Sequence, residues 1–184
     1  VDEDVADVAA SKLTGALPAI SGAALTNLPG GGKVLQVVSG HKSDTFTTTS
    51  ASFTDITGLT ATITPSSTSS KILVICSIAV SNASATYGTQ IRLLRGATSI
   101  AGGDLAGSRQ QSIGQYSMSV THQVSSITTN YLDSPASTSA TIYKAQGLTQ
   151  SGSGGLYINR SGDDADVSQH GRYASTITLM EIGA

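Results

Sequence analysis

The alternation of threonine with apolar residues over short stretches restricts this chain mainly to β-structure. Residues 59–64 read Leu-Thr-Ala-Thr-Ile-Thr, and residues 176–179 read Thr-Ile-Thr-Leu. In a strand, side chains two positions apart share a face, so each stretch has one polar and one apolar face. Ser and Thr make up 51 of the 184 residues, and the sequence has no blocks rich in Ala, Glu, Lys and Leu with helical spacing. The sequence therefore predicts an all-β fold.

Turn residues divide the second part of the chain, residues 33–184, into short strands. The cluster from Pro65 to Ser70 and the link from Arg95 to Thr98 are typical turns. Roughly ten short strands at this spacing predict one antiparallel β-sandwich or jelly roll. Longer loops are expected at 102–114 and 149–172. The strands are expected at 33–39, 44–49, 53–56, 59–64, 71–81, 89–95, 99–101, 115–124, 128–132, 141–148, 155–159 and 174–182.

Residues 1–32 differ from the rest and are expected to form an extended N-terminal stalk. Pro18 and Pro29 prevent a continuous helix or ladder, and the glycine run 30–32 indicates a boundary. The segment is too small to build a core for its own apolar side chains. Three copies around a common axis would bury them, which predicts a homotrimer, whereas a flexible tail is the alternative. The residues concerned are Leu13, Leu17, Ile20, Leu25 and Leu28.

Charge and hydropathy exclude two classes of partner. The net charge is −2 and Lys and Arg do not cluster, so a nucleic-acid backbone is not an expected partner. The longest apolar run, residues 72–80, is far shorter than the roughly twenty residues of a membrane-spanning helix. This run is expected to be a core strand covered on both faces, with Cys76 buried and unreactive within it. Because the chain begins at Val1, it is either processed or a section of a longer polypeptide.

Four stretches resemble the fibre and appendage proteins of tailed bacteriophages. They are 13–23 (LTGALPAISGA), 58–74 (GLTATITPSSTSSKILV), 130–135 (NYLDSP) and 175–182 (STITLMEI). The resemblance implies a trimeric fibre on the virion exterior, joined to other virion proteins through its N-terminal segment. It also implies that the distal β-domain contacts the host surface. Tail fibre, head fibre and capsid decoration remain open, and no binding residue is carried over, because receptor contacts in such proteins lie in variable loops.

The sequence predicts a protein that is not an enzyme and needs no cofactor. Any of its many serines can be matched with a histidine and an aspartate by chance, so such a triad has no weight. Glycan hydrolysis would need two carboxylates about 5 to 10 Å apart in a groove. Asp104, Asp133 and the cluster 163–166 are the only candidates.

Metal binding has little support in the sequence. Asp163, Asp164 and Asp166 could supply oxygens to Ca²⁺, but a solvated acidic turn is the favoured interpretation. The histidines at 41, 122 and 170 are far apart in the sequence and lack the spacing of a zinc site. No metal is therefore expected.

The two long loops are the expected sites of host-surface contact, because binding residues concentrate on loops held by a rigid scaffold. Tyr157 and Arg160 are the leading candidates for binding a carbohydrate, one as an aromatic face and the other as a planar donor. The alternative is a decoration or connector protein that binds only other virion proteins. The full candidate set is Arg109, Gln110, Gln111, Tyr116, Tyr157, Asn159, Arg160 and Arg172.

Overall fold

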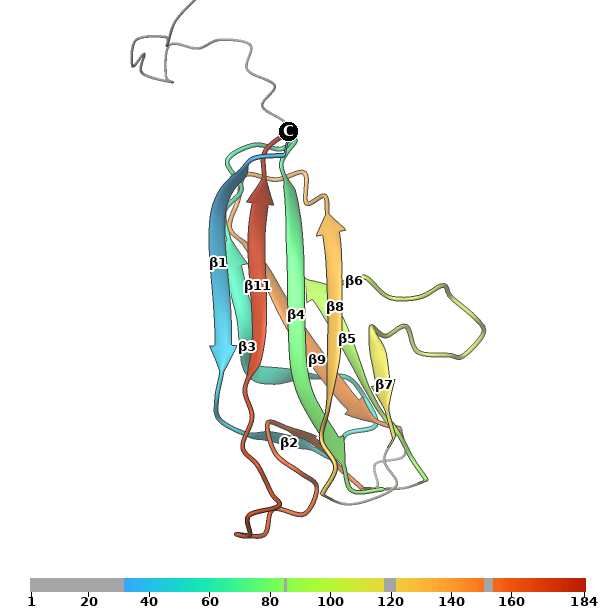
Figure 1. Cartoon of the computed structure of the whole chain (residues 1–184). Coiled ribbons are helices and arrows are strands. Elements are labelled where there is room, and N and C mark those ends of the chain that lie inside the picture. The colour runs from blue at the N-terminus through green and yellow to red at the C-terminus, as the bar shows by residue number, and fades with distance from the viewer. Residues whose placement is uncertain (1–31, 85, 118–121, 151–153) are drawn as a thin grey trace, which may run out of the picture. The chain divides into compact units, whose positions relative to one another are not determined.

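The computed structural model describes residues 32–84, 86–117, 122–150 and 154–184, and these residues form strands and loops without a helix (Figure 1). No helix within these ranges could therefore cross a membrane. The stalk residues Leu13, Leu17, Ile20, Leu25 and Leu28 lie outside the described residues. The strands are β1 (Val34–Lys42), β2 (Phe46–Thr48), β3 (Thr54–Ile63), β4 (Lys71–Asn82), β5 (Thr89–Arg95), β6 (Thr98–Ile100), β7 (Gly114–Tyr116), β8 (Ser125–Asp133), β9 (Thr141–Thr149), β10 (Leu156–Ile158) and β11 (Ser175–Ile182).

The strands form two antiparallel sheets. Sheet A has the order β1-β11-β4-β10-β2, with β8 on the other edge of β4. Strand β4 is long enough to pair with β11 along its first half and with β10 near its end. Sheet B has the order β3-β9-β5-β6, with β7 also pairing with β5. The expected all-β, antiparallel class is confirmed.

The two sheets enclose one hydrophobic core. Strand β11 alternates buried and half-buried positions along its whole length, as period-2 burial requires. Cys76 is 1 % exposed, and burial raises the pKa of its thiol to about 12, so its expected burial is confirmed. Strand β4 is not covered on both faces, because Ile75 is 40 % exposed on the face away from the core. The largest fully buried apolar side chains include those of Leu59, Ile72, Ile78, Leu93, Tyr143 and Leu179.

Close packing of the two sheets at one edge depends on Gly40 of β1. A Cβ atom at this position would lie 2.2 Å from the carbonyl oxygen of Thr60 on β3. It would also lie 3.0 Å from Cγ2 of Ile177. Any side chain here would therefore push β1 of sheet A away from β3 of sheet B.

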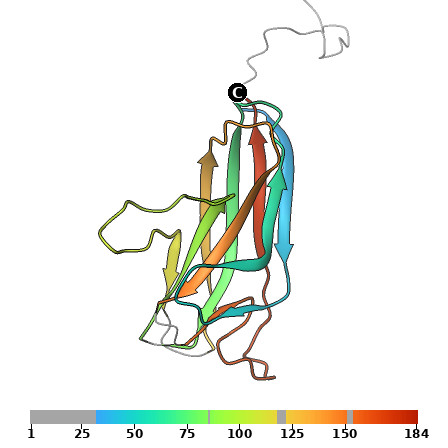
Figure 2. The ribbon, with the colours of Figure 1, turned by 180° about the vertical axis from the view of Figure 1, so that it is seen from behind.

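The head, residues 32–184, has two distinct ends. We call the end at which the preceding chain joins Gly32 the attachment end. There the backbone N–H of Gly32 donates to Gly183 O, and that of Gly183 donates to Lys33 O. At the far end, Leu156 of β10 pairs with Asn82 of β4, and Thr149 N donates to Ser50 O. Figures 1 and 2 show the attachment end beside the C-terminus and the long loop after β10 at the opposite end. The chain before Gly32 is thus joined to the end opposite that loop.

Most strand predictions agree with the structure, and two need correction. The stretches 53–56 and 59–64 belong to one strand, β3, whose pairing with β9 is interrupted between Asp55 and Thr60. Gly58 lies in this interruption with φ of +82°. Of the strand predicted at 115–124, the structure shows β7, Gly114–Tyr116, at the start, and the described residues 117 and 122–124 form no strand.

Candidate functional site

A polar groove lies at the far end, on the face of sheet B that points away from the core. Gln90 of β5 pairs directly with Gln115 of β7 and with Leu148 of β9, so these three side chains share a face. Their neighbours Ile91 and Gly147 face the core instead. The groove has a volume of about 540 Å³. Its lining residues are Ala51, Gln90, Ser108, Arg109, Gln110, Ser112, Gln115, Leu148 and Gln150.

Three glutamine side chains form a connected network along this groove. Gln115 Oε1 accepts hydrogen bonds from Gln90 Nε2 at 3.3 Å and from Gln150 Nε2 at 3.1 Å. Gln150 Oε1 in turn accepts from the backbone N–H of Gly88 at 3.0 Å. The network fixes the orientation of the amides, so their remaining donors and acceptors point in defined directions.

One acceptor of this network has no partner among the described residues. Gln90 Oε1 is buried, and no donor from the described part of the chain reaches it. An acceptor that is buried without a hydrogen bond costs about 1 to 3 kcal/mol.

The loop between β6 and β7 supplies one wall of the groove. Its conformation is held by Arg109 N, which donates to Ala106 O, and by Ile113 N, which donates to Ile91 O at 2.8 Å. Gln111 Nε2 donates to Gly103 O at 2.6 Å, so the Gln111 side chain braces the loop. Arg109 and Gln110 are exposed and line the groove. Of the predicted residues in this loop, two therefore reach the groove and one supports it.

Tyr116 does not present its ring at this groove. Its side chain is half-buried and packs against the core. The hydroxyl oxygen is buried without a hydrogen bond from the described residues. Burial raises the pKa of the Tyr116 hydroxyl. The structure therefore places Tyr116 in a packing role.

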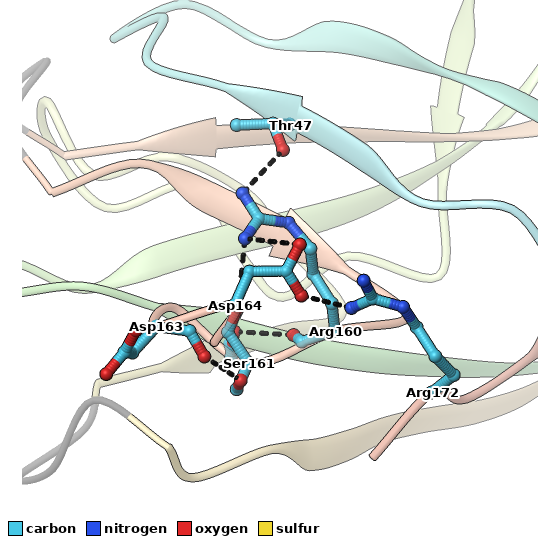
Figure 3. A network of polar contacts seen from close by, with 7 residues as sticks. Thr47, Arg160, Ser161, Asp163, Asp164 and Arg172 are labelled. Carbon is cyan, nitrogen blue, oxygen red and sulfur yellow. Dashed lines mark hydrogen bonds and ion pairs between the residues drawn. The ribbon is translucent and has the colours of Figure 1, made fainter. Parts of the chain in front are cut away.

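Tyr157 and Arg160 are close together, but most of their recognition groups are already engaged. The Arg160 guanidinium lies 4.2 Å from the centroid of the Tyr157 ring and covers one face of it. It also donates to Thr47 Oγ1 at 3.3 Å and lies 3.5 Å from the Asp164 carboxylate (Figure 3). Only 15 % of the Arg160 side chain is exposed. This pair therefore acts mainly in holding the loop after β10 against β2.

Arg172 completes the same cluster. Its guanidinium pairs with Asp164, and this hydrogen bond holds the pKa of the Asp164 carboxyl below its usual value (Figure 3). Ser161 donates to the backbone oxygen of Asp163. Arg172 keeps 59 % of its side chain exposed, so it remains accessible at the surface.

Asn159 is a structural residue, which corrects its place in the candidate set. It is fully buried, and its Nδ2 donates to Lys42 O and to Asp44 O, each at 2.9 Å. Its Oδ1 accepts from Ser175 Oγ at 2.7 Å. Its φ of +62° lies in the left-handed region that asparagine tolerates better than most residues. Asn159 cannot contact a receptor from this position.

The acidic cluster and the histidines do not assemble a metal site in the described ranges. Asp164 faces arginines, and no group of three or more His, Cys, Asp or Glu side chains within those ranges is arranged to hold a metal ion. His122 and His170, which are far apart in the sequence, stack with their ring centroids 6.3 Å apart.

A scan against models of protein families and a search of curated proteins find no match to this chain. Its function must be inferred from the groove and the surrounding surface.

The groove can form many neutral hydrogen bonds and supply one positive charge. Its described lining contains amides, hydroxyls and Arg109, together with the apolar Leu148 and Ala51. Asp, Glu and His are absent from these lining residues. Sequence reasoning missed Gln90, Ser108, Ser112, Gln115 and Gln150. Gln90 and Gln115 each lie near the start of an expected strand, but the sequence did not show the antiparallel pairing that joins them.

Proposed function

We propose that this chain is the head and stalk of a trimeric virion fibre of a tailed phage, with a β-sandwich head of the jelly-roll type that binds host-surface carbohydrate. The observation that carries the proposal is the groove lined by the hydrogen-bonded amides of Gln90, Gln115 and Gln150. The protein acts by binding, and neither catalysis nor a cofactor is part of this function.

Neutral or weakly acidic sugars suit the chemistry of this groove. An amide side chain offers two donors and a carbonyl acceptor, and a sugar hydroxyl is both donor and acceptor. Gln90, Gln115 and Gln150 place several such groups along one surface, while Arg109 adds a donor fork at the rim. Sites of this kind combine a few placed polar groups with a partly apolar floor, here Leu148.

The groove lies at the end of the head away from Gly32, and this position supports a role in binding to the host surface. The chain preceding the head joins it at Gly32, and Gln90 lies near the start of β5 at the far end. Carbohydrate contacts are individually weak, and a trimer would present three grooves about one axis. Linked sites gain apparent affinity by effective concentration without any new contact.

A connector or decoration protein that binds only other virion proteins is the alternative function. The resemblance to phage appendages is compatible with both. The two differ in whether the far end of the head contacts a cell-surface glycan or a protein. The groove favours the glycan because its described lining consists mainly of amides and hydroxyls, which can pair with the hydroxyls of a sugar.

The test compares two pairs of substitutions in the full chain. Arg109→Ala with Gln115→Ala removes two groove groups, and Arg172→Ala with Gln169→Ala removes the same residue types from the exposed loop after β10. Binding is measured on an array of neutral and acidic bacterial surface oligosaccharides and by adsorption to host cells. The groove pair should lose about tenfold or more in affinity, because two hydrogen bonds contribute about 1 kcal/mol each.

The matched control pair should bind like the wild type. If only the control pair loses binding, the binding surface is the loop after β10 and not the groove. If the groove pair adsorbs normally and the wild type binds no glycan, the attachment function is overturned and the connector function is favoured. Melting temperatures of both pairs show whether a loss of binding follows from unfolding.

A further inference from the structure

The outer face of sheet A, which points away from the core, changes from polar to apolar along its length. Residues paired across adjacent antiparallel strands project from the same face. Near the middle of β4, one row across the sheet consists of His41, Thr176, Ser77 and Thr128, and the next of Ser39, Thr178, Ile75 and Asn130. The following row, toward the attachment end, consists of Val37, Met180, Leu73 and Leu132.

Strands β1, β11, β4 and β8 lie side by side in Figure 1. The outward residues of β1, β11 and β8 change from polar to apolar at matching positions, whereas β4 changes one row earlier, at Ile75, and begins with Lys71. The pairing of Val34 with Ile182 extends the apolar region to the attachment end. The outer face of an antiparallel sheet can be polar where it contacts water, as the polar rows of sheet A are. Exposure to water alone therefore does not explain the apolar rows.

The apolar region is open to solvent in a single head. Val37 and Leu132 are each 55 % exposed, and Val34 is 53 % exposed. Contiguous exposed apolar patches on soluble proteins commonly indicate an interface. We name this surface, formed by Val34, Val37, Leu73, Leu132, Met180 and Ile182, the apolar end of sheet A.

We infer that the apolar end of sheet A is the surface through which copies of this chain pack against one another. Its one charged neighbour among the described residues of these rows is Lys71, whose Nζ donates to Ser134 Oγ at 2.7 Å. Apart from Lys71, these rows present apolar side chains, so apolar contact and not charge pairing would hold the copies together. Association about a common axis turns the same surface of each copy toward that axis.

The attachment of the preceding chain favours a second copy as the occupant. Thirty-one residues precede Gly32, and they enter the head at the end where the apolar rows lie. This step rests on the proposed trimeric fibre: if the stalk residues hold three chains together, three apolar ends are brought to high local concentration. Their contact would remove the exposed apolar surface from water at the point where the heads meet.

The first experiment is sedimentation of the full chain over a range of concentrations. Val37→Asp with Leu132→Asp introduces two charges on β1 and β8 in the apolar row. Ser39→Asp with Asn130→Asp introduces the same charges on the same strands one row away. Because a buried unpaired charge is costly, the first pair should weaken association about a hundredfold or more, whereas the second should change it by less than about threefold.

A second measurement does not depend on a disruptive substitution. Leu132→Cys and, on the outer face of sheet B, exposed Thr62→Cys each add one accessible thiol, while Cys76 is buried. A maleimide should label Leu132→Cys much more slowly than Thr62→Cys in the assembled protein, and equally fast after dilution below the association midpoint.

Each outcome has a distinct consequence. A wild type that associates, with a Val37→Asp/Leu132→Asp variant that associates equally well, overturns this interface and leaves the fibre proposal standing. A wild type that is monomeric at all concentrations overturns both the interface and the trimer. A monomer in which the Leu132→Cys thiol is protected assigns the surface to the stalk segment of the same chain and also overturns packing between copies.

Discussion

The hydroxyl of Tyr143 on β9 donates a 2.6 Å hydrogen bond to Oδ2 of Asp133 on β8, joining sheet B to sheet A near the attachment end. Arg95 Nη1 reaches both oxygens of the same carboxylate at 2.8 Å. Tyr143 is fully buried and Asp133 nearly so. Burial, and then the hydrogen bond to Asp133, raise the pKa of the Tyr143 hydroxyl. These three residues hold the two sheets together through polar contacts that are largely buried.

Replacing Tyr143 with Phe should destabilise the head by about 1.5 to 3 kcal/mol, the usual contribution of a hydrogen bond to a charged group. The ring keeps its packing, so the loss reports the hydroxyl alone. Urea unfolding measures it, with Tyr131→Phe on the exposed part of β8 as the control. The control should change the unfolding free energy by less than about 0.5 kcal/mol. Equal stabilities of the two variants would show that the Tyr143 hydroxyl does not support the fold.

Strand identity was predictable from the sequence because it depends on local patterns. The bounds of β5 coincide with the prediction, and those of β4 and β11 differ by one residue. The long loop expected at 102–114 was also predictable, and residues 101–113 form no strand. The groove was not predictable, because Gln90 and Gln115 meet only through non-local pairing and loop packing. For the same reason, nothing in the sequence distinguished buried Asn159 from a surface amide.

Gly40→Ala should destabilise the head by about 1 to 3 kcal/mol, the usual cost of overpacking a tightly packed site. The new Cβ would meet the backbone oxygen of Thr60 at 2.2 Å, and backbone cannot rotate away as a side chain can. Gly103→Ala is the matched control, since nothing lies within 4 Å of a Cβ there. Thermal melting of the two variants compares them. A Gly40→Ala protein as stable as Gly103→Ala would mean that β1 and β3 can separate at no cost.

The head should become less stable as the pH falls from about 4.5 to about 2, because the stabilising contribution of ionised Glu181 is lost in this range. Burial acts to raise the pKa of this fully buried carboxyl, but hydrogen bonds from Gln36 Nε2 and from the Ser66 N–H and hydroxyl outweigh it and set the pKa at about 2. A folded-state pKa below the unfolded value stabilises the fold above the unfolded pKa. That contribution is lost as protons bind in the folded state.

Urea midpoints measured between pH 7 and pH 2 test this expectation. Glu181→Gln should be less stable than the wild type at pH 7, and the difference should shrink through the window below pH 4.5. Other carboxylates titrate equally in both proteins, so the difference isolates Glu181. A difference that stays constant with pH would show that the carboxylate charge contributes nothing to stability.

Asn159→Ala should destabilise the head by about 2 to 4 kcal/mol, because it leaves buried groups on two other segments without hydrogen bonds. The amide holds Lys42 O and Asp44 O at the end of β1, and it accepts from Ser175 Oγ at the start of β11. Ser175 Oγ itself accepts from Ala79 N on β4, so one side chain links three strands of sheet A.

Asn159→Gly keeps the left-handed backbone accessible and separates strain from hydrogen bonding. If the hydrogen bonds dominate, Asn159→Gly should retain most of the loss, while exposed Asn130→Ala should stay within about 0.5 kcal/mol of the wild type. A stable Asn159→Ala protein with reduced glycan binding would instead return Asn159 to the recognition surface, against its complete burial.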